Sequence, residues 1–238
     1  MLKRIFFIIV VFVIGMVGGI FADQIFWPYF IERSLFYQYN LEQQPIYLTE
    51  EKEIYIQENV ALTETIEKVK KSVVGVVAKT KNGQILRGSG LIVTTDGLMI
   101  TLAELVPPGS DFSFYLNNKK VSFQILKRDW NQNLALVKIS DSALTTLGFA
   151  DLENLKIGER VLLIGMVCEK ENCAPVANEG IIKSFNENFL QTNIRDDLTL
   201  AGSPLFNIKG EVLGINSFDT NGALIAIPNS QIKKFLNL

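Results

Sequence analysis

The feature that most constrains the fold is a series of short runs of β-branched and aromatic residues that begins after Ser72 and continues almost to the C-terminus. Runs of this length, separated by glycine, asparagine, aspartate and proline, are typical of short antiparallel strands. The first set comprises Val73–Lys79, Ile85–Val93, Leu98–Leu102, Phe112–Leu116, Lys120–Leu126 and Leu134–Ile139. Six short strands of this kind suit a closed antiparallel barrel.

A second set of six runs follows Leu155, and short helices are expected on either side of the two sets. The second set comprises Arg160–Met166, Val176–Ser184, Phe189–Thr192, Pro204–Asn207, Val212–Phe218 and Ala223–Ile227. The pattern predicts helices from Thr63 to Lys71 and from Ser230 to Leu236. Pattern alone therefore predicts an all-β domain without fixing its topology.

The N-terminus carries an uncharged apolar run from Ile5 to Ala22, preceded by Lys3 and Arg4. As a helix, this run would cross about 27 Å of hydrocarbon. A cleaved signal peptide has a shorter apolar core and small residues at its cleavage site, which Ile20-Phe21-Ala22 matches poorly. We therefore expect an uncleaved signal anchor, with residues 5–22 in the membrane. The basic residues place the N-terminus in the cytoplasm and the rest of the chain outside.

Residues 24–60 are expected to form a juxtamembrane segment. Its first part is aromatic, with Phe26, Trp27, Tyr29, Phe30, Phe36, Tyr37 and Tyr39, and its second part is acidic, with Glu42, Glu50, Glu51, Glu53 and Glu58. The aromatic residues suit a membrane–water boundary or packing as a short helix against the domain. The acidic residues indicate a solvated stalk. Gly15 and Gly19 have a spacing that can bring two helices together, so a homo-oligomer is one option.

Charge and cysteine content exclude several classes of ligand. The net charge is −2 and no basic patch is evident in the sequence, which argues against nucleic acid as a partner. Cys168 and Cys173, in a polar loop after the run Arg160–Met166, are the only cysteines. A zinc site usually needs four ligands, and the chain has no histidine, so we expect neither a metal nor a cofactor. A small disulfide is favoured over free thiols outside the cytoplasm.

Three stretches carry recognisable motifs. They are Gly88–Val106, which begins Gly-Ser-Gly, Asp129–Ile139, which contains Leu134-Ala135-Leu136, and Gln191–Leu205, which ends Gly-Ser-Pro-Leu. Together with Gly210–Asn216 and Ala226–Pro228, they resemble the protease domain of the HtrA/Deg family of trypsin-like serine proteases. The resemblance runs from Ser72 to the C-terminus. It implies two six-stranded antiparallel barrels, with the active-site positions in the crevice between them.

The resemblance also identifies the positions at which this family carries its catalytic groups. Glu104 stands where the family has its catalytic histidine, Asn133 where it has the aspartate that orients that histidine, and Ala201 where it has the nucleophilic serine. Thr199 replaces the glycine whose N–H helps form the oxyanion hole. Such positions often need positive φ, which threonine adopts only at a cost, so the hole is expected to be misshapen.

These replacements predict a trypsin-like scaffold without peptidase chemistry. Ser203 lies two residues past the nucleophile position and has no histidine to activate it. Glu104 alone is a poor base for peptide hydrolysis, because carboxylate-driven hydrolysis relies on paired carboxylates or a metal. We expect Glu104 and Asn133 to hydrogen-bond to each other, to backbone or to water.

The expected organisation is an anchor at 1–23, a stalk at 24–60 and a trypsin-like domain at 61–238, with barrels at about 72–140 and 145–228. No PDZ domain is expected. We therefore expect a membrane-anchored pseudoprotease that binds a protein or peptide outside the cytoplasm through Glu104, Asn133, Thr199 and Ala201. The resemblance implies a bacterial source. Two alternatives stay open: a peptidase with an unorthodox or partner-completed mechanism, and a structural protein of the cell envelope.

Overall fold

The computed structural model describes residues 2–24, 60, 62–141, 144–169, 172–219 and 221–238. The chain divides into two compact units, Met1–Gln57 and Glu58–Leu238. The expected aromatic and acidic stalk at 24–60 lies almost entirely outside the described residues and stays a prediction.

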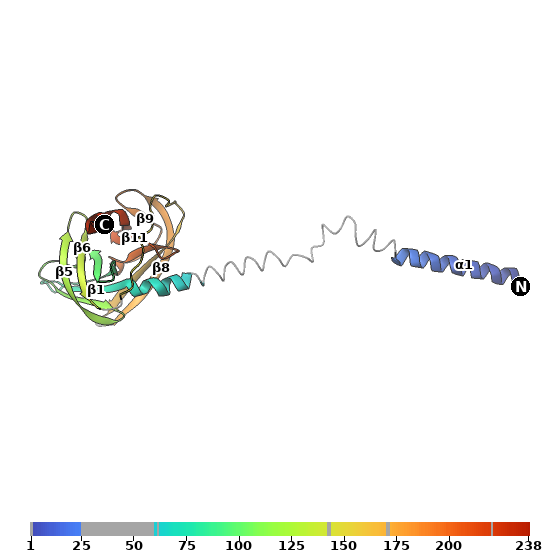
Figure 1. The fold of residues 1–238 in the computed structure, drawn as a ribbon, viewed down its shortest axis with the longest axis horizontal. Helices are drawn as coiled ribbons and strands as arrows, with labels where there is room; N and C mark the ends of the chain where they lie inside the picture. The colour runs from blue at the N-terminus through green and yellow to red at the C-terminus, as the bar shows by residue number, and fades with distance from the viewer. Residues whose placement is uncertain (1, 25–59, 61, 142–143, 170–171, 220) are drawn as a thin grey trace. The chain divides into compact units, whose positions relative to one another are not determined.

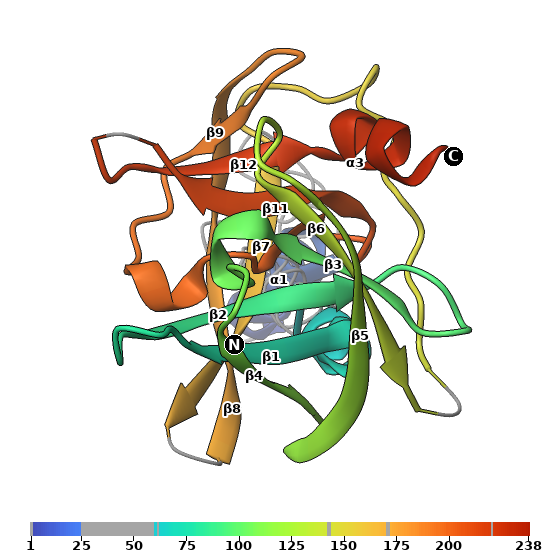
Figure 2. The same ribbon diagram turned by 90° about the vertical axis from the view of Figure 1, so that its left-hand side faces the viewer.

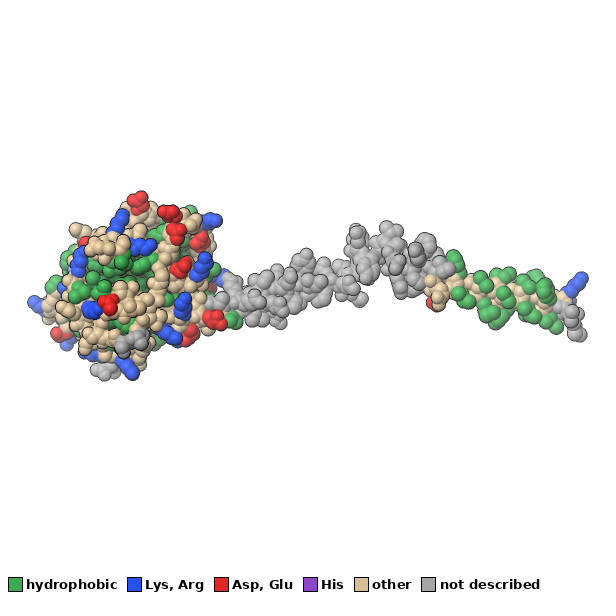
Figure 3. Space-filling model, viewed as in Figure 1, with side chains coloured by type: hydrophobic (Ala, Val, Ile, Leu, Met, Phe, Trp, Pro, Cys, Tyr) green, Lys and Arg blue, Asp and Glu red, His purple; other side chains and the backbone are tan. Residues whose placement is uncertain are grey.

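The described part of the first unit, residues 2–24, consists mainly of helix α1, Leu2–Phe21. Hydrophobic side chains cover most of its surface (Figure 3). The segment Lys3–Gln24 has a mean hydropathy of 2.9 and is long enough to cross a membrane. A secretory signal sequence meets the same criterion of length and hydropathy.

The second unit begins with helical turns at 62–69 and a 3₁₀ turn at Lys70–Ser72, close to the helix expected from the sequence. The first barrel follows, built from β1 (Val73–Lys79), β2 (Ile85–Ile92), β3 (Leu98–Leu102), β4 (Asp111–Leu116), β5 (Lys119–Asp129) and β6 (Leu134–Ser140). Its strands close in the order β1-β2-β3-β6-β5-β4, all antiparallel (Figure 2).

The second barrel comprises β7 (Arg160–Glu169), β8 (Asn172–Phe185), β9 (Leu190–Thr192), β10 (Pro204–Asn207), β11 (Val212–Phe218) and β12 (Leu224–Pro228). It closes in the order β10-β11-β12-β9-β8-β7 and is followed by helix α3, Asn229–Leu236 (Figure 1). The predicted class is confirmed: two closed six-stranded antiparallel barrels with a C-terminal helix, and an apolar helix at the N-terminus.

The hydrophobic core is shared between the barrels. One cluster of buried residues contains side chains from both, including Val74, Leu102, Phe206 and Ile215. A second cluster, which includes Val161 and Leu213, fills the second barrel. Full burial of each such side chain stabilises the fold by about 1.5–3 kcal/mol. The shared cluster therefore holds the two barrels together as one body.

The β7–β8 hairpin differs from the expectation for the cysteines. Cys168 and Cys173 lie on the two strands, directly opposite each other, and not in a loop after β7. Their Cα atoms are 4.0 Å apart and their sulfurs form a disulfide. Both strands run several residues further than the hydrophobic pattern indicates, because main-chain pairing and the disulfide hold this part of the hairpin together.

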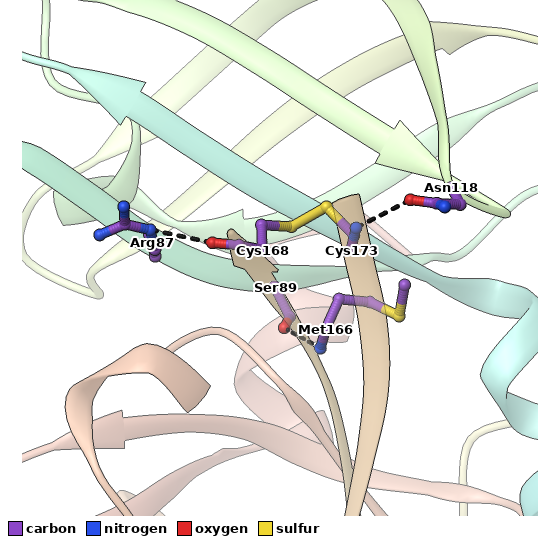
Figure 4. Close-up of a disulfide and its surroundings, with 6 residues drawn as sticks. All are labelled: Arg87, Ser89, Asn118, Met166, Cys168 and Cys173. Carbon is purple, nitrogen blue, oxygen red and sulfur yellow. Dashed lines mark hydrogen bonds between the residues drawn. A yellow bond between two sulfur atoms is a disulfide. The ribbon is translucent and has the colours of Figure 1, made fainter. Parts of the chain in front are cut away.

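The disulfide is buried against the first barrel. Cys168 is 1% exposed and Cys173 6% exposed. The main-chain oxygen of Cys168 accepts a hydrogen bond from Arg87 Nε at 2.9 Å, and the N–H of Cys173 donates to Asn118 Oδ1 at 2.8 Å (Figure 4). A Cβ atom on Gly75 of β1 would lie 2.5 Å from Cys168 Sγ, so this glycine makes room for the disulfide.

The hairpin also leaves an exposed strand edge, because β8 pairs with β9 only from Ile182 onward. Every second residue along this edge turns its main-chain N–H and C=O groups away from β7: these are residues 173, 175, 177, 179 and 181. The bonds of Cys173 to Asn118 and of Ile181 to Asn193 show this orientation. Pro175 has no N–H, and Glu179 N donates to Asn178 Oδ1 at 2.8 Å. Of the outward donors between 173 and 181, only Ala177 N–H has no described partner.

We predict that Gly75→Ala destabilises the wild-type protein by about 1–3 kcal/mol, because the new methyl group meets the disulfide. The paired change Cys168→Ala with Cys173→Ala should cost about 2 kcal/mol, from the chain entropy of a loop of this length. In the cysteine-free background, Gly75→Ala should cost much less. Urea unfolding of the four proteins measures the coupling.

Gly148→Ala is the matched control, because no atom lies within 4 Å of a Cβ built there. Equal losses for Gly75→Ala in both backgrounds would show that the disulfide does not set the requirement for glycine.

Candidate functional site

Glu104 and Asn133 meet at the edge of the first barrel. Glu104 lies in a 3₁₀ turn, Ala103–Leu105, directly after β3, and Asn133 ends the turn before β6. Asn133 has φ of +51°, a left-handed conformation that asparagine tolerates well. Its main-chain oxygen accepts from Ala103 N at 3.1 Å, which fixes the two turns relative to each other.

The two side chains form a reciprocal pair. Asn133 Nδ2 donates to Glu104 Oε1 and Asn133 Oδ1 accepts from Glu104 N, each at 3.1 Å. The expected hydrogen bond between these residues is therefore present. Asn133 Nδ2 also reaches Ser217 Oγ on β11 at 3.4 Å, a contact between the barrels. The Glu104 side chain is solvent-exposed.

Ala201 follows a second 3₁₀ turn, Leu198–Leu200. Its side chain is 5% exposed and carries no functional group. Its N–H donates to Leu198 O at 3.1 Å, which closes the turn. Its carbonyl accepts from Ser89 N at 2.8 Å, which ties this loop to β2 of the first barrel.

Asp197 organises the same turn. Its Oδ1 atom accepts the N–H of Thr199 at 2.8 Å, and it also accepts the Thr199 hydroxyl. The hydroxyl bond, followed by the N–H bond, holds the pKa of the Asp197 carboxyl below its ordinary value. Thr199 is not among the described residues with positive φ. The expected strain at this position is therefore absent, because the segment forms a 3₁₀ turn instead.

The turn leaves no oxyanion donor facing outward. In trypsin-like proteases the hole is made by two N–H groups, one of them from the nucleophile itself. The resemblance places the first at Thr199, and the second falls at Ala201, the position of the nucleophile. Here the first donates to Asp197 Oδ1 and the second to Leu198 O. Stabilisation of an oxyanion needs donors aimed at the reacting oxygen in advance. Both donors are instead used inside the turn.

Ser203 faces the protein interior. It is fully buried, and its hydroxyl donates to Leu200 O at 2.6 Å. Its carbonyl accepts from Asn216 Nδ2 at 2.9 Å. The hydroxyl therefore has no access to a ligand in the crevice.

A pocket of about 330 Å³ lies in the crevice between the barrels. It brings together Glu104, Thr199 and Ala201; Asn133 does not line it but bonds to Glu104. The remaining lining residues are Gln84, Ile85, Leu86, Arg87, Leu105, Leu198 and Phe218. None of these seven was predicted as a site residue, because they stand at none of the catalytic positions and reach the pocket only through tertiary folding.

One wall of this pocket is an open strand edge. Thr80 N donates to Gln84 O at 2.9 Å, so these two residues form a hydrogen-bonded pair where β1 and β2 meet. Because hydrogen-bonded and non-hydrogen-bonded pairs alternate along an antiparallel ladder, the main-chain groups of Ile85 and Arg87 point away from β1. Ser89, two residues on, has the same orientation and bonds to Ala201 across the crevice. Strand β3 pairs with β2 only at Leu91 and Ile92. Within the described structure, the outward main-chain groups of Ile85 and Arg87 have no partner.

No group of three or more metal-ligating side chains is present among the described residues. The only carboxylate that lines the crevice pocket is Glu104. This arrangement offers apolar surface, one acid and main-chain hydrogen bonds, and therefore suits binding of an extended segment better than proton transfer.

Comparison with known proteins finds a match to the trypsin-like peptidase domain over residues 88–215. The similar proteins include a "Probable periplasmic serine endoprotease DegP-like" of Halomonas elongata, 32% identical over 139 residues, which are 55% of this chain and 29% of that protein. A protein of the same description from Pseudomonas putida F1 is 30% identical over 151 residues, 59% of this chain and 31% of that protein.

"Serine protease HTRA1" of Xenopus tropicalis is 32% identical over 167 residues, which are 63% of this chain and 35% of that protein. The matched region thus spans about a third of the length of these relatives.

Proposed function

Because this chain belongs to the trypsin-like peptidase domain family, we propose that it is a membrane-anchored member that lacks peptidase activity and binds an extended segment of a protein partner outside the cytoplasm. The observation that carries the proposal is the crevice pocket. At the positions that the resemblance assigns to catalysis it presents Glu104 and Ala201, beside the open edge of β2.

The loss of peptidase activity is supported by what the chemistry requires. Trypsin-like hydrolysis uses a histidine base, a nucleophile and oxyanion donors. The chain has no histidine, Ala201 has no nucleophilic atom, and the two N–H donors are used inside the 3₁₀ turn. Proteases without their triad keep about 10³–10⁴-fold acceleration over water, which comes from the oxyanion hole and substrate binding. In this chain the part of that acceleration that comes from the oxyanion hole is lost as well.

Binding is supported by the contrast between two strand edges. An extended peptide can add to an exposed edge through main-chain hydrogen bonds, while neighbouring pockets select its side chains. The edge of β8 has almost no free N–H donors, because Pro175 has no N–H and the N–H of Glu179 donates to Asn178 Oδ1. The edge of β2 at Ile85 and Arg87 keeps its donors and acceptors and borders an apolar pocket.

An unorthodox peptidase is the less favoured alternative. A carboxylate-based mechanism needs a second acid or a metal, and no second carboxylate lines the crevice pocket in the described structure. A purely structural role remains a separate outcome of the binding experiment below.

Membrane anchoring is supported by α1 and by the basic residues Lys3 and Arg4 before its apolar run. The relatives described as periplasmic support a location of the barrels outside the cytoplasm.

We predict that the full chain in detergent neither cleaves casein nor reacts with a fluorophosphonate probe. The triple variant Glu104→His, Asn133→Asp, Ala201→Ser should remain poorly active, because its oxyanion donors stay engaged. Adding Asp197→Ala and Thr199→Gly should raise kcat about tenfold or more, since one such donor is worth about 10²–10³ in kcat. Labelling of the natural chain that disappears in Ser203→Ala would contradict the proposal.

A photo-crosslinking residue at position 198 should capture a partner segment in native membranes, because Leu198 lines the crevice pocket and is 68% exposed. The same residue at position 157 is the control, since Ile157 is 70% exposed and lies outside this pocket. Ala201→Trp should suppress the adduct at 198 by filling the pocket while the domain stays folded, with a loss of about 1–3 kcal/mol in stability because Ala201 is only 5% exposed. Mass spectrometry identifies the captured segment.

If position 157 captures the partner while 198 stays silent, or if Ala201→Trp leaves the adduct at 198 unchanged, the crevice is not the binding site. The structural role would then be the better explanation.

A C-terminal alkaline phosphatase fusion should be active, because the positive residues keep the N-terminus in the cytoplasm. N-terminal sequencing of the mature chain should begin at or next to Met1. A mature chain that starts near Asp23 would identify the apolar run as a cleaved signal.

A further inference from the structure

A second pocket, of about 470 Å³, lies on the second barrel beside the hairpin between β11 and β12. One wall consists of Lys183 on β8 and residues 191–196, which include the end of β9. Residues 221–224 also line the pocket. This pocket shares no lining residue with the crevice pocket, yet one chain segment connects them: residues 191–196 line this pocket, and Leu198, Thr199 and Ala201 line the crevice.

The charged groups of this pocket are unbalanced. Lys183 and Arg195 are both exposed, and neither forms an ion pair within the described structure. Asp196 is the only carboxylate that lines the pocket, and both of its oxygens are engaged. Its Oδ1 accepts from Asp197 N and its Oδ2 from Asn178 Nδ2, each at 3.0 Å. The acid is therefore held by its own chain, and the two cations remain available.

The amide side chains on the same wall are oriented as donors. Asn193 Oδ1 accepts from Ile181 N at 2.7 Å, and Gln191 Oε1 accepts from Ser184 Oγ at 3.0 Å. With their oxygens occupied by neighbouring strands, both amides have their NH₂ groups left for a ligand. The wall therefore combines two cations with two amide donors, in a chain whose net charge is −2.

We propose that this pocket binds a carboxylate, supplied by an aspartate or glutamate side chain of the same partner segment that occupies the crevice. Cations and N–H donors that line one pocket are the groups that recognise carboxylates. Because residues 191–201 run from this pocket to the crevice, one extended partner can occupy both. The inference rests on the proposed function and adds the chemical class of the partner: the bound segment is acidic.

The test uses the full chain in detergent and two fluorescein-labelled peptides of about twelve residues, one alternating glutamate with alanine and the other alternating glutamine with alanine. Fluorescence anisotropy should give a Kd for the glutamate peptide at least about tenfold below that for the glutamine peptide. This ratio corresponds to a difference of about 1.4 kcal/mol between the two binding free energies. The preference should decline with added salt.

Lys183→Gln combined with Arg195→Gln should abolish the preference for the glutamate peptide. The matched control is Lys156→Gln combined with Lys209→Gln, which removes the same charge from exposed lysines outside this pocket. This control should keep the preference. Free glutamate at about ten millimolar should compete only weakly, because a lone ion lacks the contacts in the crevice; full displacement would identify free carboxylates as the ligand and overturn the proposal for a peptide.

Equal binding of the two peptides, binding of neither, or equal losses in the two double variants would also overturn the proposal. Leu198→Asp separates this inference from the proposed function. If both peptides bind equally and Leu198→Asp weakens both, the crevice binds peptides and only the acidic preference is wrong.

Discussion

The arrangement of the two barrels depends on the hydrogen bonds of one buried serine. Ser89 on β2 is fully buried; its N–H donates to Ala201 O, its hydroxyl accepts from Met166 N at 2.8 Å, and its carbonyl accepts from Thr101 Oγ1 at 2.7 Å. Two of these bonds cross from one barrel to the other. Each buried group left without its partner would cost about 1–3 kcal/mol, so neither barrel can shift without breaking them together. The position of Ala201 in the crevice follows from this constraint.

The same constraint explains how a scaffold can persist when its reactive groups are replaced. Gly202 has φ of +76°, and a Cβ there would collide with Ser89 O, so this glycine is required by packing whatever stands at 201. Glu104 and Thr199 make no comparable demand on the core, because their side chains lie at the crevice, where a substitution changes chemistry with little effect on folding. Ala201 is 5% exposed and belongs to the shared cluster, so it contributes to the core as well as to the crevice. Framework and chemistry therefore depend largely on different residues.

Hydrophobic pattern predicted the strands well where nearly every residue is buried, as in β3 and β11. It could not supply the closure of the barrels, which came from the family resemblance. It failed at the tip of the β7–β8 hairpin because Ala174 and Pro175 are exposed, so no burial pattern marks the strand. In the site, the pairing of Glu104 with Asn133 could be expected from the resemblance. The Asp197 bond that closes the 3₁₀ turn could not, because it depends on local main-chain geometry that sequence motifs do not encode.

The exposed edge of β8 has a consequence for copies of this chain that meet one another. Long flat edges act as templates on which sheets grow from molecule to molecule, and this leads to aggregation. Pro175 removes one donor from the template, and Asn118 and Asn178 occupy two more. Molecules crowded on a surface would thus find too few main-chain bonds along β8 to polymerise. The hairpin that joins the barrels can project into solvent without making the protein self-associate into fibres.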